Sequence, residues 1–405
     1  MALLDSARGF PRAYWFLWLG TLINRVGGLV VPFLAFYLTG ERGFSFEEAG
    51  VVASLFGLGS LGAGPIGGVL ADRFGRRITM VLGLALGALA MLHLGLARSL
   101  WHIQLAAFLL GGLGDLYRPA VWAAVSDLVP AKDRTRAFGL LYWAMNLGFA
   151  AASLLAGALA SGGFWILFAG DAITSLAMAV VVYLAVPETR PPRSRVREAS
   201  AAADAMAPFR DGVFLSFAGV SFLLAFLFLQ HLTALPLDLR AHGFAASTYG
   251  ALIAINGILI VLLQPFAVRV VQGRRRSRVL SLGAALVGIG FGLTAVARTW
   301  PLYALSIALW TLGEILLSPV TPTIVADLAP PELRGTYQGV QQMTWGAAFC
   351  LAPAMGSWVL ARLGSTALWV GCLVVGLFAA VAHLLIAGAR GRRLRELGGA
   401  NLGGD

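Results

Sequence analysis

The chain has 405 residues, of which 59% are hydrophobic and only 12% are charged, and its formal net charge is +11. Soluble domains carry about 25% charged residues, so this chain has too little charge to cover a surface that faces water. The composition excludes an ordinary cytosolic enzyme, a disordered protein and a secreted disulfide scaffold, and it predicts a polytopic membrane protein.

Twelve apolar runs are long enough to cross a bilayer, which takes about 20 helical residues. The first run is longer than the apolar region of a signal peptide, and no small-residue cleavage site follows it, so we expect a span rather than a cleaved leader. The predicted spans, one to twelve in chain order, are 13–38, 47–71, 78–97, 101–127, 137–160, 164–186, 212–236, 247–271, 279–297, 301–327, 336–361 and 366–388.

The basic residues are distributed unequally between the two sides of these spans. Of the 30 Lys and Arg residues, 23 fall on the side that holds both termini, five fall on the other side, and Arg25 and Arg118 lie within spans. Basic residues collect in cytoplasmic loops, so we expect both termini in the cytoplasm of a multi-pass protein of the bacterial inner (plasma) membrane. The positive charge is then a matter of topology, and we expect no nucleic-acid partner.

The longest internal loop, residues 187–211, falls between spans six and seven. It separates an N-terminal six-helix bundle (1–186) from a C-terminal six-helix bundle (212–390), which a cytoplasmic tail (391–405) follows. The predicted fold class is therefore an all-α membrane protein with twelve transmembrane helices in two bundles.

The two bundles match each other in sequence at a constant shift of 200 residues. The matches involve Gly, Pro, Asp and Arg rather than only the abundant Leu and Ala, so they indicate an internal repeat and pseudo-symmetric bundles. A parallel repeat of this kind is a known transporter architecture, with the substrate site between the halves near the bilayer midplane. The matched pairs include Gly50 with Gly250, Pro65 with Pro265, Arg98 with Arg298, Pro119 with Pro319, Asp127 with Asp327, and Arg134 with Arg334.

The loop after span two carries a recognisable motif. It reads Gly67-Gly68-Val69-Leu70-Ala71-Asp72-Arg73-Phe74-Gly75-Arg76-Arg77, which resembles the G-x-L-x-D-R-x-G-R-R motif (motif A) of the major facilitator superfamily. With the twelve spans and the repeat, the resemblance covers essentially the whole chain. It implies that superfamily's fold and secondary transport of a small molecule, with a proton gradient as energy source and no bound cofactor.

Motif A suggests a mechanical role. We expect Asp72 to lie at a helix N-terminus in the opposite half, where the helix dipole favours a carboxylate, and Arg73 and Arg77 to reach Asp127 at the end of span four. Alternatively, these charges only set the topology. The predicted latch, which would hold the cytoplasmic side shut in the outward-facing state, consists of Gly68, Asp72, Arg73, Gly75, Arg76, Arg77 and Asp127.

The second copy of the motif, residues 269–275, keeps Gly-Arg-Arg but has no Asp. We expect Arg269 or Arg274 to pair with Asp327 there, in a weaker second latch.

Polar and ionisable residues inside spans are costly and therefore indicate function. In the superfamily that the chain resembles, helices 1, 4, 7 and 10 line the central cavity, and here each of these four spans carries such residues. They are Asn24 and Arg25, Asp115 and Arg118, Gln230 and His231, and Glu314. His93, Asp171 and His383 lie on other spans, and we expect His93 and His383 to be peripheral.

The candidate proton-coupling residues are Glu314, Asp115 and Arg118. Asp115 and Arg118 share one helix face, so they form either a fixed ion pair or a carboxyl whose protonation the arginine modulates. Arg118 stands where drug:proton antiporters of the superfamily carry an arginine (motif B), although Pro119 follows it. Glu314 has no basic neighbour in its own span and is a candidate proton carrier, unless Arg25 faces it.

The candidate substrate-cavity residues are Asn24, Arg25, Gln230, His231, Asn146 and Trp310. Arg25 either neutralises one of the two acids or binds an anionic substrate group, and His231 is either a wall residue or a proton site. The start of span five, from Tyr142 to Gly148, resembles that of proton-coupled members, but Leu141 stands where they have an acid and the Gly-Pro motif (motif C) is missing.

The sequence therefore predicts a proton-coupled transporter that works by alternating access and exports hydrophobic or cationic drugs. The alternative is a proton symporter that imports a sugar, a peptide or an organic anion. No metal spacing, catalytic constellation or nucleotide-binding loop supports an enzyme or ATP drive. We expect a monomer whose partners are substrate, protons and lipid.

Overall fold

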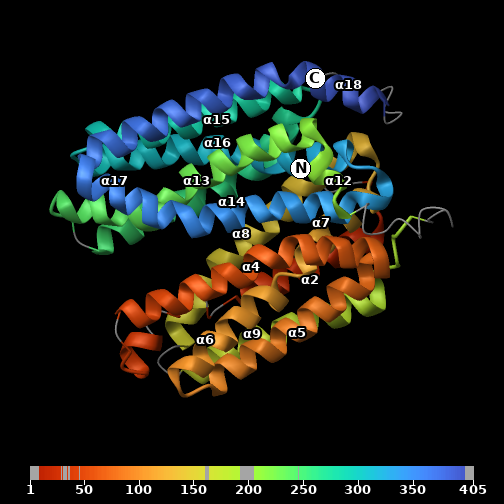
Figure 1. Cartoon of the computed structure of the whole chain (residues 1–405), viewed down its shortest axis with the longest axis horizontal. Helices are drawn as coiled ribbons and strands as arrows, with labels where there is room; N and C mark the ends of the chain where they lie inside the picture. Colours follow the sequence, from red (N-terminus) through yellow and green to blue (C-terminus); the bar gives the residue numbers. More distant parts are fainter. Residues whose placement is uncertain are drawn as a thin grey trace.

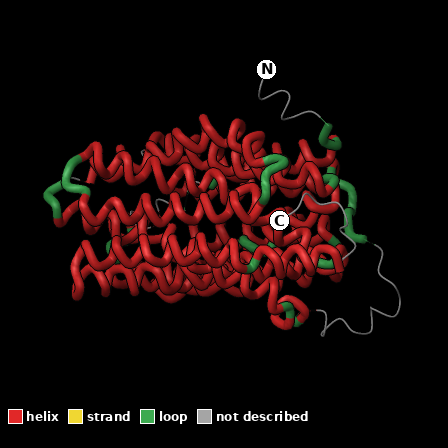
Figure 2. Tube along the Cα trace, turned by 90° about the horizontal axis from the view of Figure 1, so that it is seen from above, coloured by secondary structure: helices red, strands yellow, loops and turns green. Residues whose placement is uncertain are grey.

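The computed structural model describes residues 9–28, 30, 34, 37–44, 46–159, 164–191, 205–244 and 246–396. All regular secondary structure in these ranges is helical, which confirms the predicted all-α class. Figure 2 shows long helices running alongside one another in one main direction. Most of the predicted linker, with Arg193, Arg195 and Arg197, lies outside the described residues, as do Arg8 and the end of the tail.

The first half of the chain runs from α2 to α9. Its elements are α2 (Arg12–Val26), the π-helical turn η2 (Tyr37–Glu41), α4 (Phe46–Phe74), α5 (Arg76–Leu96), α6 (Leu100–Gly114), α7 (Tyr117–Leu128), the 3-10 turn η3 (Ala131–Asp133), α8 (Arg134–Leu159) and α9 (Phe164–Ala185).

The second half repeats this order of long helices. Its elements are α12 (Ala207–Arg210), α13 (Gly212–Ala241), α14 (Ala246–Val271), α15 (Arg276–Leu293), the 3-10 turns η5 (Thr294–Val296) and η6 (Pro331–Leu333), α16 (Trp300–Leu328), α17 (Arg334–Leu385) and α18 (Ala387–Glu396). The side chain of Asp211 accepts a hydrogen bond from the Phe214 amide at 3.0 Å and so caps the start of α13.

Eight helical stretches of the described chain are long and apolar enough to cross a membrane. One of them contains α17, in which Gly364 has a φ of +86° and breaks the helix into two segments. Glycine tolerates this left-handed conformation because it has no Cβ. Predicted spans eleven and twelve therefore follow one another with hardly any loop between them.

Two predicted spans are not continuous helices. The first ends early, because α2 stops at Val26 and is followed by Gly27 and Gly28. The fourth is divided into α6 and α7 at Asp115 and Leu116. Pro119 contributes to the second break, because proline has no N–H to donate to the Asp115 carbonyl and its ring crowds that carbonyl.

The helices of the two halves form two groups that lie side by side (Figure 1). Helices α2, α4, α5, α6 and α9 lie in one group, and α13 to α17 lie in the other. The short helices α12 and α18 lie at one end of the molecule in this view. Phe10, near the start of the described chain, is at the same end. Its ring centroid lies 4.4 Å from the guanidinium of Arg136, which follows loop 129–133 in the chain. We call this end, which carries loops 129–133 and 329–333, the latch end.

Close packing of α4 on α17 joins the two groups. A Cβ added to Gly64 would lie 2.6 Å from the Gly339 carbonyl oxygen, and one added to Gly68 would lie 2.3 Å from the Gly335 carbonyl oxygen. The two helix backbones therefore touch over this stretch, which only small residues permit.

Candidate functional site

Asp72 lies at the N-terminus of a helix in the opposite half. Its carboxylate accepts hydrogen bonds from the backbone N–H of Gly335 at 3.0 Å, and from the backbone N–H and hydroxyl of Thr336, both at 2.6 Å. Gly335 and Thr336 belong to the first turn of α17. The carboxylate satisfies amides that have no partner within the helix and meets the positive end of the helix dipole.

The buried arginine of motif A is Arg76. Its side chain is fully buried and forms ion pairs with Asp72 at 2.9 Å and with Asp127 at 3.1 Å. The expectation that Arg73 and Arg77 reach Asp127 is therefore wrong. Gly75 turns the chain between α4 and α5 with a φ of +113°, which directs Arg76 inward and leaves Arg73 exposed. The Arg77 guanidinium instead lies 4.8 Å from the ring centroid of Tyr183.

Two pseudo-equivalent charge bridges link the halves at the latch end. In bridge one, Asp127 pairs with Arg76 of its own half and with Arg334 of the other half at 2.6 Å. In bridge two, Asp327 pairs with Arg276 of its own half at 2.5 Å and with Arg134 of the other half.

The partners in bridge two correct the expectation that Arg269 or Arg274 pairs with Asp327. Arg276 is the residue that the shift of 200 relates to Arg76, and it begins α15 as Arg76 begins α5. The repeat therefore extends to these ion pairs, although the second half has Gln272 in place of Asp72.

The start of the linker packs on the same motif. The Glu188 carboxylate accepts the backbone N–H groups of Arg76 at 2.9 Å and Arg77 at 3.2 Å, and so caps the start of α5. The Arg190 guanidinium donates to the carbonyl oxygen of Arg73. Sequence reasoning singled out this loop only for its length and composition and assigned no contact to Glu188.

Glu314, in α16, is held by neutral groups from both halves. One carboxylate oxygen accepts the hydroxyl of Tyr142 from α8, and the other accepts the side-chain amide of Asn256 from α14 at 2.8 Å. Within the described part of the chain, Glu314 forms no ion pair. Arg25 therefore does not hold Glu314 in its ionised form. The Tyr142 hydrogen bond connects the first half directly to this acid.

Asp115 has different surroundings. Its carboxylate lies 2.8 Å from Nε of Arg118 and also accepts the hydroxyl of Ser60 from α4. Of the two sequence interpretations, the geometry favours a fixed ion pair. Both acids nevertheless contact a polar side chain on a neighbouring helix, since Asp115, just after the end of α6, meets Ser60 of α4, and Glu314 of α16 meets Asn256 of α14.

Asn24 and Arg25 lie near the end of α2. Both polar atoms of the Asn24 side chain are used within the first half, since its amide donates to Ser175 at 3.0 Å and its oxygen accepts the Tyr117 hydroxyl at 2.9 Å. Arg25 packs against α8, where a Cβ added to Gly148 would lie 2.5 Å from Cβ of Arg25. Asn24 therefore links α2 to α7 and α9. Of the two arginines in the four cavity spans, Arg118 pairs with Asp115 and Arg25 lies outside that pair.

The remaining cavity candidates divide between packing and surface. Gln230 is fully buried and donates to the Ala352 carbonyl of α17 at 3.2 Å, which does not fit a residue that contacts substrate in this conformation. Trp310 is also buried, and it stacks on His231 with ring centroids 5.6 Å apart. Asn146 donates to the Tyr142 carbonyl of its own helix.

An aromatic cluster extends from these residues to the surface of α17. Phe228 contacts His231, Trp310 and Trp345 edge to face. Trp345 is 41% exposed, whereas Trp310 is 1% exposed. Trp345 is thus the accessible member of the cluster.

Comparison with known proteins places the whole chain in one family. The family model described as Major Facilitator Superfamily matches residues 17–240 and 231–401. An uncharacterized MFS-type transporter of Bacillus subtilis, YttB, is 28% identical over 93% of this chain and 95% of its own length. The multidrug resistance protein MdtH of Aeromonas salmonicida is 27% identical over 84% of this chain and 85% of its own length.

Other relatives and solved structures extend this result. A Na(+), Li(+), K(+)/H(+) antiporter of Planococcus maritimus is 25% identical over 86% of this chain and 92% of its own length. The structure of the proton:xylose symporter XylE has a TM-score of 0.75 at 16% identity, covering 91% of this chain and 94% of that one. The chain is therefore a transporter, not an enzyme, and it belongs to the Major Facilitator Superfamily.

Proposed function

We propose that the protein is a proton-coupled secondary transporter that exports hydrophobic or cationic compounds by alternating access. The observation that carries the proposal is the setting of Glu314, a carboxyl inside a membrane span whose hydrogen-bond partners, Tyr142 and Asn256, are neutral and come from both halves. An acid in this setting can be neutral or ionised without leaving a buried counter-charge unpaired.

The hydrogen bonds of Glu314 supply a coupling step. An ionised carboxylate only accepts hydrogen bonds, so it holds Tyr142 and Asn256 together. When Glu314 takes up a proton, one of its oxygens becomes a donor, and the bond that this oxygen accepted must rearrange. Because Tyr142 belongs to the first half, proton uptake loosens or redirects a contact between the halves, and proton release restores it.

The substrate class is supported by the relatives and by the aromatic cluster. Relatives named multidrug resistance protein MdtH match more than four-fifths of the chain. Trp345 presents an exposed aromatic surface next to Phe228, which suits a lipophilic or cationic compound. The alternative, a proton symporter for a sugar, a peptide or an organic anion, would use Arg25 as its anion ligand, since Arg118 is already paired with Asp115.

The latch contacts support an outward-facing state. Asp72 and both charge bridges join the halves at the latch end, which we assign to the cytoplasm from the distribution of basic residues. We expect them to break when the halves rock and the substrate site opens inward, in a monomer in the bacterial inner membrane.

Purified protein in liposomes with a trapped pH dye tests the proposal. A panel of lipophilic cations and small anionic solutes is added, with Glu314→Gln as the test variant and Glu41→Gln, at an exposed acid, as the control. Opposed fluxes of protons and a lipophilic cation that E314Q abolishes, and that persist in E41Q, support the proposal. Co-directional fluxes would establish the symporter, and substrate movement without protons would refute proton coupling.

A further inference from the structure

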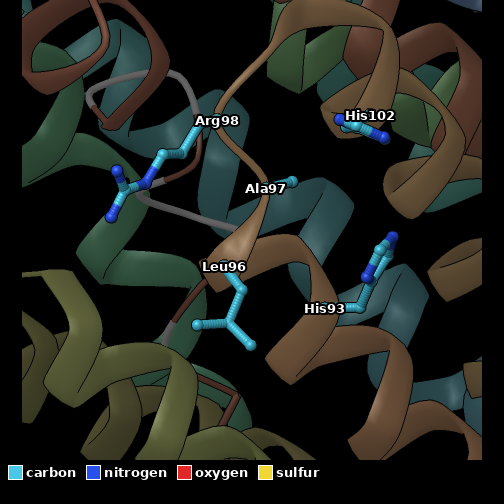
Figure 3. Close-up of a pocket in the computed structure, with 5 residues that line it drawn as sticks. All are labelled: His93, Leu96, Ala97, Arg98 and His102. Carbon is cyan, nitrogen blue, oxygen red and sulfur yellow. The ribbon is translucent and has the colours of Figure 1, made fainter.

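A pocket of about 260 Å³ lies at the end of the first half opposite the latch end. It is formed where α5 ends and α6 begins, and it is lined by His93, Leu96, Ala97, Arg98 and His102 (Figure 3). It is remote from Glu314 and from the latch, and the transport mechanism proposed above uses none of its residues.

The pocket interrupts a surface that faces hydrocarbon. On α5, His93 belongs to a line of exposed residues spaced three and four apart, which is one face of a helix. The other members are leucines, of which Leu89 is 63% and Leu96 is 66% exposed. The full line is Leu82, Leu86, Leu89, His93 and Leu96. A histidine one turn from the end of a leucine face places a polar ring at the depth where acyl chains give way to headgroups.

The adjoining face of α6 has the same character. Trp101 is 60% exposed at the start of α6, and the exposed residues Leu105 and Phe108 continue that face along the helix. Tryptophan is enriched at the boundary between hydrocarbon and headgroups. The mouth of the pocket therefore lies at the membrane surface, between two faces that lipid chains cover.

The two histidine rings converge on the pocket. In Figure 3 the rings of His93 and His102 extend toward one another from α5 and α6, while the Arg98 side chain leaves on the other side of Ala97. The Ser99 hydroxyl lies 2.8 Å from Nδ1 of His102, which leaves Nε2 of that ring for a ligand. A second guanidinium lies close by, because Arg42 donates to the Ala97 carbonyl at 3.0 Å. The pocket thus combines two imidazole rings with two guanidinium groups in its neighbourhood.

The repeat shows that the two histidines are not among the residues that the two halves share. The shift of 200 relates Ala97 and Arg98 to Ala297 and Arg298, whereas it relates His93 and His102 to Leu293 and Leu302. Packing of this corner therefore works with leucine at both positions. The histidines provide something that the fold does not require.

We propose that this pocket binds the phosphate of an anionic phospholipid from the leaflet opposite the cytoplasm. His93 and His102 donate hydrogen bonds to phosphate oxygens, Arg98 and Arg42 add positive charge to the surroundings of the pocket, and the acyl chains lie along the exposed leucines of α5. A soluble anion would gain the hydrogen bonds but not the apolar contacts, so the lipid is the ligand that uses both features.

Native mass spectrometry of the full chain, loaded with phosphatidylglycerol in nanodiscs, tests the assignment. The variant H93L/H102L copies the residues of the second half, and R298L is the control at the equivalent corner. We expect H93L/H102L to retain one tightly bound phosphatidylglycerol fewer, with about a tenfold loss of occupancy, since hydrogen bonds to a charged group contribute at least that much. H93Q/H102Q, which keeps N–H donors, should restore part of the occupancy, and R298L should equal wild type.

Three results would overturn the proposal. One is unchanged lipid retention in H93L/H102L. Another is equal retention of phosphatidylethanolamine by the wild type, which would remove the anionic preference. The third is displacement of the lipid by millimolar inorganic phosphate, which would identify a site for a soluble anion. If H93L/H102L does not fold, the single variant H102L, on the exposed first turn of α6, gives the same comparison.

Discussion

The two acids inside the membrane spans differ in what they contact, although both lie on the helix pair that the repeat relates. Asp115 is paired with Arg118, so protonating it would leave the arginine charge uncompensated. Glu314 contacts the Tyr142 hydroxyl and the Asn256 amide, which remain satisfied or can turn when the carboxyl changes its charge. In the function that we propose, this difference makes Glu314 the proton carrier and gives Asp115 a structural or modulating role.

Tyr142→Phe should impair coupling, because it removes the hydrogen bond between the halves at Glu314 and little else. A hydrogen bond to a charged group contributes about 1.5–3 kcal/mol, so proton-driven transport should fall about tenfold or more. The measurement is proton-coupled flux in liposomes. Tyr183→Phe, on the exposed face of α9, is the matched control and should behave as wild type. Normal coupled flux in Y142F would contradict the coupling step.

Asp72→Asn should slow transport while leaving substrate affinity nearly intact. The amide keeps the size of the side chain, but it loses the charge that pairs with Arg76 and faces the N-terminus of α17. Flux and equilibrium binding of the same compound give the two readouts. Gln272→Asn, at the related exposed position of the second half, is the control. Unchanged flux in D72N would refute a latch role for Asp72.

The sequence predicted the position of Asp72 at the latch but not which arginine of motif A pairs with Asp127. Motif A and the dipole argument led to Asp72 at a helix N-terminus, and Asp72 lies at one. The choice of Arg73 and Arg77 failed because the direction of each side chain depends on the turn at Gly75, which motif spacing does not reveal. Tyr142 was missed as a partner of Glu314, because a contact across the halves depends on the conformation that the halves adopt. Asn256 was missed because the packing of α14 on α16 decides which side chains of the two helices meet.

At the scale of helices, composition located most spans within a few residues, because their ends are marked by charges and turns. It failed where the helix is interrupted inside an apolar run. Pro119 marked the break between α6 and α7, yet prolines also lie inside continuous helices here, such as Pro65 in α4 and Pro265 in α14. Whether a proline breaks or only bends a helix depends on its packing.

Gly64→Ala should hinder the approach of α4 to α17. The added Cβ would lie 2.6 Å from the Gly339 carbonyl oxygen, which is closer than such atoms approach, so one backbone must move. We expect slower transport and greater access of a membrane-impermeant thiol reagent to a cysteine placed at the latch end. Gly62→Ala is the control on the same helix, since the nearest atom to its added Cβ is 3.9 Å away. Equal behaviour of the two variants would exclude this contact as a determinant of closure.

At the scale of the whole molecule, the two charge bridges make closure of the latch end nearly symmetric. Each bridge contains an aspartate, an arginine of the same half and an arginine of the other half. The sequence led us to expect a weaker second latch, and the second half does lack a counterpart of Asp72. The repeat nevertheless preserves the bridge itself, which indicates that both bridges contribute to holding the halves together.

Removing the arginine that crosses between the halves should open the latch end without breaking the ion pair within either half. Arg334→Gln leaves Arg76 with Asp127, and Arg134→Gln leaves Arg276 with Asp327. Each lost charged hydrogen bond contributes about 1.5–3 kcal/mol, so each variant should shift the ratio of open to closed molecules about tenfold. Arg134 also interacts electrostatically with Arg334 and Asp127 of bridge one, so the double variant should open the latch end further than either single variant, by a factor that also reports the coupling between the bridges.

Pulsed electron paramagnetic resonance measures this ratio directly. Spin labels replace the exposed residues Ile78 and Arg278, at the latch ends of α5 and α15, after Cys350 and Cys372 are changed to serine. R334Q and R134Q should each increase the fraction of molecules in which the two labels are farther apart, and in the double variant this fraction should dominate. Lys132→Gln, in the exposed loop, should leave the distance distribution unchanged. If the double variant opens the latch end no further than one single variant, only one bridge holds the halves together and the symmetric interpretation fails.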